Sequence, residues 1–147
     1  MRFMTEDEIF LVDSNILIYN YDTSDPTKHA ISKRLIDSCW KKEIKLAISA
    51  QNLSEFFFVT TRKGFLTKKD AVENISDMID FDNFLKLDFD HKTVLDAAKI
   101  SEEHDMSYWD SLLAATMRQN SVLNLYTENA KDFKIPWLNV VNPFGKK

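Results

Sequence analysis

Glycine and proline are scarce in this chain of 147 residues, which contains two glycines and three prolines. Average proteins use about 7% glycine and about 5% proline. A G-x-G-x-x-G dinucleotide turn or a G-x-x-x-x-G-K phosphate loop needs clustered glycines, because only glycine lets the backbone approach a phosphate so closely. Gly64 and Gly145 are too far apart for either loop. The scarcity excludes both loops and favours a helix-rich fold over an all-β sandwich, whose tight turns use more glycine and proline.

Cysteine and long apolar runs are also scarce, and acidic residues outnumber basic ones. Cys39 is the single cysteine, so it has no partner for a disulfide or a zinc cluster, and we expect a small buried hydrophobe in a reducing compartment. No apolar run approaches the roughly 18 residues of a membrane span, and the stretch MRFMTEDEIF is acidic where a signal peptide is basic. The net charge of −4 argues against a protein that coats nucleic acid by bulk electrostatics. We therefore expect a soluble, cytoplasmic protein with no membrane attachment.

The order of apolar patterns predicts an α/β fold. A length of 147 residues and a hydrophobic content of 44%, without linkers or repeats, indicate a single domain over residues 1–147. Short apolar runs predict strands at residues 9–12, 46–48, 84–87, 122–126 and 138–141. Amphipathic patterns and capping residues predict helices at residues 15–19, 26–42, 50–63, 67–80, 90–104 and 107–120. Strands separated by helices imply a mainly parallel central sheet in a three-layer α/β/α arrangement. The helix at 50–63 is apolar on nearly every side and is expected to be buried.

Three acidic residues stand in apolar surroundings. Asp13 ends the first predicted strand, and ligands of open parallel sheets bind beyond the carboxyl ends of strands. Glu55 leaves its helix between apolar neighbours in the stretch SEFFFV, and Asp110 shares a helix face with Leu113 and Ala114. An ionised carboxylate in a dry site costs several kcal/mol unless it is paired or binds a metal. These acids are therefore the candidate functional residues.

Each acid also has an ordinary structural interpretation. Asp13 could cap the helix that follows it, Glu55 could keep its carboxylate in water, and Ser107-x-x-Asp110 has the spacing of a capping box. Taken together, three converging carboxylates suit Mg²⁺ or Mn²⁺, which bind oxygen ligands and complete their octahedron with water and substrate phosphate. The sequence therefore indicates metal-assisted phosphoryl chemistry.

Several stretches, in chain order, resemble the PIN-domain ribonucleases, in particular the VapC-like toxins of type II toxin–antitoxin pairs. LVDSNILIY is similar to the family's strand-end aspartate, and SAQNLSEFFFVTTRK to the helix that carries its glutamate. YWDSLLAATMRQNSVLNLYTENAKDF resembles the helix of the third aspartate and the strand after it, and VVNPF resembles the end of many such chains. The resemblance runs from Ile9 to Phe144 and implies a PIN-like fold.

The resemblance implies that Asp13, Glu55 and Asp110 are the catalytic, metal-binding acids. The implied reaction is Mg²⁺- or Mn²⁺-dependent hydrolysis of RNA phosphodiester bonds by a metal-activated water, which leaves 5′-phosphate and 3′-hydroxyl ends. The implied partners are an RNA substrate, a small antitoxin that blocks the acidic cleft, and a second copy of the chain in a homodimer.

The fourth acidic position of the family is altered in this chain. The family often has a T-x-D pattern there, and Thr127-Glu128-Asn129 places Asn129 at the position of the acid. Glu128 or Asp132 could substitute as a ligand, or a second metal could arrive with RNA. The implied supporting residues are Ser14, Asn15 and Thr127. Candidate phosphate contacts are Arg62, Lys63, Lys131 and Lys134.

Two other functions fit parts of the sequence. A phosphatase or phospho-acceptor domain could use Asp13 as its nucleophile, although the haloacid-dehalogenase type has a second acid where this chain has Asn15. A PIN-like binding module with weak or no activity would be consistent with Asn129. Trp109 and Trp137 could stack on bases, but core packing is the expected role of both.

Overall fold

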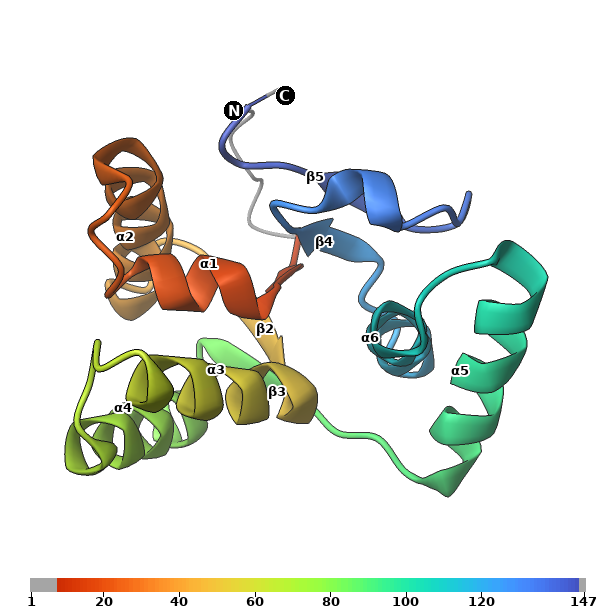
Figure 1. Cartoon of the computed structure of the whole chain (residues 1–147), viewed down its shortest axis with the longest axis horizontal. Coiled ribbons are helices and arrows are strands. Elements are labelled where there is room, and N and C mark those ends of the chain that lie inside the picture. The colour runs from red at the N-terminus through yellow and green to blue at the C-terminus, as the bar shows by residue number, and fades with distance from the viewer. Residues whose placement is uncertain (1–7, 146–147) are drawn as a thin grey trace.

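The computed structural model describes residues 8–145 and contains a five-stranded sheet (Figure 1). The strands are β1 (Phe10–Val12), β2 (Leu46–Ser49), β3 (Phe84–Leu87), β4 (Asn124–Tyr126) and β5 (Asn139–Val141). Their order across the sheet is β3-β2-β1-β4-β5, and every neighbouring pair is parallel. The predicted α/β class is confirmed, and each strand lies within two residues of its expected start.

Helices cover the two faces of the sheet. They are α1 (Ser14–Tyr19), α2 (Pro26–Trp40), α3 (Ala50–Arg62), α4 (Lys68–Asp80), α5 (His91–His104) and α6 (Tyr108–Gln119), with a short 3₁₀ helix η1 (Ala130–Asp132) after β4. In Figure 1, α1 to α4 gather on one side, and α5 and α6 lie on the other. None of the helices in the described part of the chain is long and apolar enough to cross a lipid bilayer.

The first strand shows how the two layers arise. Phe10 and Val12 belong to the core beneath α1 to α4, whereas Leu11 between them belongs to the core beneath α5 and α6. This alternation follows from the two-residue period of a strand, which sends successive side chains to opposite faces. All three residues are buried, as expected for a central strand of a parallel sheet covered on both sides.

Local sequence signals set the helix ends. Asp25 caps α2 by accepting a hydrogen bond from the backbone N–H of Lys28 at 3.2 Å, and Pro26 takes the first helical position. Gly64, with φ of +75°, follows the last turn of α3 in the left-handed conformation that glycine adopts without strain. Cys39 is fully buried, as predicted, and burial raises the pKa of its thiol to about 11, so the thiol is unreactive at neutral pH.

Two expectations about burial are wrong. Helix α3 is not buried all round, because only the stripe of Asn52, Phe56 and Thr60 faces inward, and Phe58 is 59% exposed. Trp109 is 64% exposed rather than part of the core, since the buried face of α6 begins at Ser111. Trp137 is half-buried and packs against the core while Arg118 lies 4.7 Å above its ring.

Candidate active site

The candidate site lies at the carboxyl ends of the three middle strands. Asp13 directly follows β1, Ser49 ends β2 and begins α3, and Thr127 directly follows β4. Because β1 lies between β2 and β4 in a parallel sheet, these three ends meet at one edge. The sheet order therefore brings together residues that are far apart in the sequence.

Asp13 is held by donors from three elements. Its Oδ1 accepts a hydrogen bond from the backbone N–H of Ser14 at 2.8 Å, and its Oδ2 accepts one from the Thr127 hydroxyl at 2.8 Å. The side-chain nitrogen of Asn52 lies 3.4 Å from Oδ1. Asp13 is thus the N-cap of α1, as its structural interpretation required, and at the same time the centre of a polar cluster. Burial raises the pKa of Asp13 more than the hydrogen bonds from Thr127 and Ser14 lower it.

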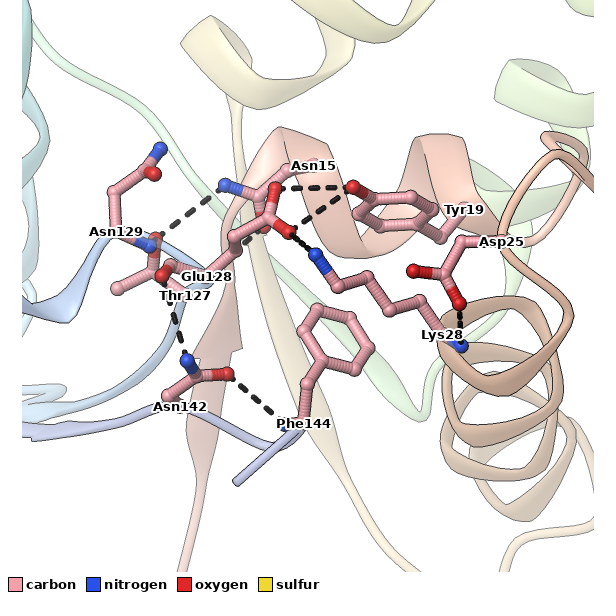
Figure 2. A network of polar contacts seen from close by, with 9 residues as sticks. All are labelled: Asn15, Tyr19, Asp25, Lys28, Thr127, Glu128, Asn129, Asn142 and Phe144. Atoms are coloured by element: carbon pink, nitrogen blue, oxygen red, sulfur yellow. Dashed lines mark hydrogen bonds and ion pairs between the residues drawn. The ribbon is translucent and has the colours of Figure 1, made fainter. Parts of the chain in front are cut away.

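Thr127 organises the loop that follows β4. It is fully buried, and its Oγ1 accepts hydrogen bonds from the Asn15 side-chain amide at 3.4 Å and from the Asn129 backbone N–H at 3.1 Å (Figure 2). A hydroxyl has a single hydrogen to donate, and here that hydrogen goes to Asp13. Asn15 also accepts a hydrogen bond from the backbone N–H of Glu128 at 3.4 Å, so it holds this loop at two points. Thr127 and Asn15 therefore connect Asp13, the start of α1 and the loop after β4.

Asn52 is a residue of the site that sequence reasoning missed. Its side-chain oxygen accepts a hydrogen bond from the Ser49 backbone N–H at 3.1 Å, and the Ser49 hydroxyl accepts one from the Asn52 N–H at 3.0 Å. This reciprocal capping box buries the amide completely and leaves its nitrogen beside Asp13. The spacing Ser49-x-x-Asn52, at the start of the helix that carries Glu55, was the sequence signal that could have identified it.

Glu55 and Asp110 complete the acidic cluster from two other helices. Glu55 is exposed on α3, and Asp110 is half-buried in the first turn of α6, where its N–H donates to the Ser107 hydroxyl at 3.1 Å. Desolvation raises the pKa of Glu55, and the charges of Asp13 and Asp110 raise it further. Desolvation likewise raises the pKa of Asp110, and the Asp110 charge contributes to the raised pKa of Asp13. The three predicted acids therefore lie close enough to disfavour one another's ionisation.

The donors at this site fit a hard cation. Within residues 8–145, no Lys, Arg or His forms an ion pair with Asp13, Glu55 or Asp110, so their mutual repulsion is uncompensated. In the same residues, no group of three or more histidine, cysteine, aspartate or glutamate side chains is arranged so that it could hold a metal ion. Mg²⁺ commonly takes one or two carboxylates and fills its remaining positions with water and substrate phosphate. The residues present therefore fit a metal that is bound partly through substrate.

The structure gives no support for Glu128 as a substitute ligand. Both of its carboxylate oxygens accept hydrogen bonds from the Tyr19 hydroxyl, at 3.2 and 3.0 Å, and one also pairs with the Lys28 ammonium group (Figure 2). Asn129 uses its backbone N–H to bind Thr127, and its exposed side chain points away from this ion pair. Asp132 is exposed in η1, where its charge raises the pKa of Asp110.

The four candidate phosphate contacts are all exposed. Arg62 and Lys63 lie about two turns beyond Glu55 along α3, and the Arg62 guanidinium is 5.6 Å from the Phe58 ring centroid. Lys131 lies in η1 beside Asp132, and Lys134 follows shortly after it. The structure thus places two of the cations near the η1 side of the acids and two at the far end of α3.

The Lys28–Glu128 pair should stabilise the fold more than an ordinary surface ion pair. Its side chains are only 21% and 25% exposed, and the Lys28 ammonium also lies 5.5 Å from the Tyr19 ring centroid. We expect Lys28→Ala to reduce the free energy of unfolding by about 1 kcal/mol. Lys33→Ala, which removes an exposed pair with Asp37 on the same helix, should cost about 0.3 kcal/mol. Urea titrations measure the free energy of unfolding of both variants. An equal loss in the two would contradict a larger contribution from Lys28.

A sequence model of the PIN domain family matches residues 10–135. The chain belongs to the PIN domain family. The matched segment contains Asp13, Glu55, Asp110 and Asn129. No curated protein sequence matches the chain at the significance required.

Solved structures share the fold of this PIN domain. VapBC2 from Rickettsia felis, bound to a promoter DNA fragment, is 19% identical with a TM-score of 0.64, and the match covers 91% of this chain and 98% of that chain. VapC20 from Mycobacterium tuberculosis, described as a sarcin-ricin loop cleaving toxin, is 18% identical with a TM-score of 0.64 over 83% and 92% of the two chains. DNA-bound VapBC from Salmonella typhimurium is 17% identical with a TM-score of 0.64 over 92% and 98%. These likenesses confirm the PIN-like fold.

Proposed function

We propose that this PIN domain is a VapC-like toxin, a Mg²⁺- or Mn²⁺-dependent endoribonuclease that hydrolyses RNA phosphodiester bonds. The observation that carries the proposal is the cluster of Asp13, Glu55 and Asp110 at one edge of the sheet. The ionisation of these carboxylates is mutually unfavourable, and no basic side chain of residues 8–145 pairs with them. A divalent cation would remove that repulsion and so bind where RNA phosphate must also bind.

The residues of the site divide into ligands and supports. Asp13, Glu55 and Asp110 would hold the metal, which supplies a more acidic bound water and stabilises charge that develops on the phosphate and the leaving oxygen. Thr127 keeps one Asp13 oxygen in place through its hydroxyl, while the Ser14 N–H fixes the other. These donors hold the carboxylate in one orientation before any ligand arrives, which lowers the cost of assembling the site.

A protein partner is supported by an apolar groove beside the acidic cluster. The groove lies between α3, α4 and β3 and has a volume of about 700 Å³. Its lining residues are Ala50, Leu53, Ser54, Phe57, Ile75, Ile79, Lys86 and Asp88. Phe58 and Val72 on the same two helices are more than half exposed. We propose that an antitoxin covers this apolar surface and reaches the acids with a basic side chain, and that the toxin is a cytoplasmic homodimer.

The test is cleavage of a single-stranded RNA by the purified protein. We expect cleavage with Mg²⁺ or Mn²⁺, none with EDTA, and products that carry 5′-phosphate ends, which a ligation assay detects. Calorimetric titration with Mn²⁺ provides a readout that does not depend on activity. The heat of Mn²⁺ binding should be absent in an Asp13→Asn variant. Cleavage that persists in EDTA would contradict the proposal.

Asn129 gives the alternative function a specific basis. A neutral amide is a weaker ligand than a carboxylate, and a PIN-like RNA- or protein-binding module would not need the fourth acid. Failure of the parent protein to bind Mn²⁺, together with retained RNA binding, would favour this binding module over the nuclease.

A further inference from the structure

Trp109 is the most exposed large hydrophobic side chain in the described part of the chain, with 64% of its surface accessible. It lies in the first turn of α6, directly before Asp110 and two residues after the cap Ser107. Tryptophan is enriched at binding surfaces, because its indole combines a large apolar ring with an N–H group. The position of Trp109 therefore connects an exposed ring to the acidic cluster.

One backbone hydrogen bond and one ring contact restrict Trp109. The backbone carbonyl of Trp109 accepts a hydrogen bond from the Gln51 side-chain nitrogen at 3.0 Å, which ties the start of α6 to the start of α3. The indole packs against the half-buried Tyr108 ring, with centroids 5.1 Å apart and planes at 73°. An aromatic side chain that is already oriented loses little conformational freedom when a flat ligand binds to it.

Gln51 supplies a second observation at the same place. Its side-chain oxygen is shielded from solvent and accepts no hydrogen bond within residues 8–145, while its nitrogen is occupied by Trp109. Gln51 precedes Glu55 by four residues on α3, so the two side chains lie on the same face. The Gln51 side chain thus links the helix that carries Glu55 to the first turn of the helix that carries Trp109 and Asp110. An exposed aromatic ring therefore directly precedes an acid of the cluster, at the point where α6 is tied to α3.

We propose that Trp109 stacks on one base of a single-stranded RNA beside the bond that is cut. This inference rests on the proposed function and names how the substrate is gripped. Acidic residues repel phosphates, so affinity must come partly from contacts that carry no charge. Stacking on an aromatic ring provides such a contact and accepts every base, because each base has a flat face. Trp109 is therefore a substrate-binding residue with an effect on KM.

The experiment compares Trp109→Ala and Trp109→Phe with Leu95→Ala, which truncates another exposed apolar residue on α5. The substrates are an unstructured RNA and a series in which one nucleotide at a time is abasic. We expect Trp109→Ala to raise KM about tenfold at unchanged kcat, Trp109→Phe to recover most of the loss, and Leu95→Ala to match the parent. Removing the base at one position should raise the KM of the parent by the same factor. The same abasic RNA should not raise the KM of Trp109→Ala any further.

Several outcomes would overturn the inference. Trp109→Ala could raise KM by the same factor on every abasic RNA as on the intact RNA. That result would show that the ring contacts no base. A Trp109→Ala variant with unchanged KM that elutes as a smaller species in size-exclusion chromatography would place the ring between copies of the chain. If the parent cleaves no RNA but still binds the series with the same single non-additive position, the proposed nuclease function fails and the stacking contact stands. No binding of the parent to RNA would overturn both.

Discussion

Replacing Asp13 with asparagine should reduce metal-dependent RNA cleavage by about a thousandfold or more while the domain still folds. Several kcal/mol of transition-state stabilisation depend on the metal, and a neutral amide at the most buried of the three acids weakens its binding. Asparagine caps helices as well as aspartate does, so the start of α1 should remain intact through the Ser14 N–H. The measurement is the initial rate with Mn²⁺, accompanied by thermal unfolding followed by circular dichroism.

Asp25→Asn is the matched control for this substitution. Asp25 is also an N-cap aspartate, on α2, and accepts from the Lys28 N–H at 3.2 Å. The same atom replacement there should leave the cleavage rate unchanged. An Asp13→Asn variant that cleaves RNA within tenfold of the parent, or an Asp25→Asn variant that loses activity to the same extent, would contradict the assignment of Asp13 as a metal ligand.

Thr127→Val should lower both stability and activity, although the two side chains have nearly the same shape. The substitution removes the donor to Asp13 and the acceptor for the Asn15 amide and the Asn129 N–H. Leaving buried polar groups unpaired costs about 1 to 3 kcal/mol each, so we expect a loss of about 2 kcal/mol or more in the free energy of unfolding. Thr116→Val is the control, because Thr116 is equally buried but its hydroxyl binds only the Leu112 carbonyl, a local bond within α6.

The same variant predicts a change in pH dependence. Burial holds the pKa of Asp13 above its ordinary value, and the hydrogen bond from Thr127 opposes that rise. Losing this bond raises the pKa further, so a larger fraction of the carboxyl is protonated at a given pH. Since metal binding requires the ionised form, the acid limb of the pH–rate profile should move to higher pH in Thr127→Val and stay in place in Thr116→Val. A limb that moves to lower pH would contradict the role of Thr127.

The raised pKa of Asp13 also makes the stability of the metal-free protein depend on pH. An acid whose pKa is raised by folding binds its proton more tightly in the native state than in the unfolded chain. Its contribution to metal-free stability is therefore favourable below the ordinary pKa of an aspartate, and it is lost as the pH rises through the raised pKa. In Thr127→Val the pKa of Asp13 is raised further, so the metal-free variant should lose more stability at a pH above this raised pKa than at a pH below the ordinary pKa of an aspartate.

Much of the fold followed from local patterns in the sequence. The strand that ends at Asp13, the cap Ser107 and the terminator Gly64 each leave a signature of a few residues, and the structure places them as those signatures indicate. Contacts between residues that are far apart in the sequence could not be predicted in this way. Lys28 and Glu128 are 100 positions apart, so their ion pair could not be found from spacing, and Glu128 remained a candidate ligand.

Burial was predicted less well than secondary structure. Helical periodicity shows which residues share a face, but it does not show whether another element covers that face. Phe58 and Trp109 look like core residues in the sequence and are exposed in the structure. Asn52 shows the reverse, because a polar residue in a capping box was inconspicuous although the fold buries it beside Asp13.

The central position of β1 has a consequence for the order in which the protein is made. The first strand of the chain pairs on one side with β4, and the Thr127 hydroxyl that binds Asp13 comes from a residue 114 positions later. Asp110 likewise lies on a helix near the end of the chain. During translation, an emerging polypeptide carries Asp13 and Glu55 long before their remaining partners exist. The acidic cluster therefore assembles only after nearly the whole domain has left the ribosome, so an unfinished chain lacks the complete cluster.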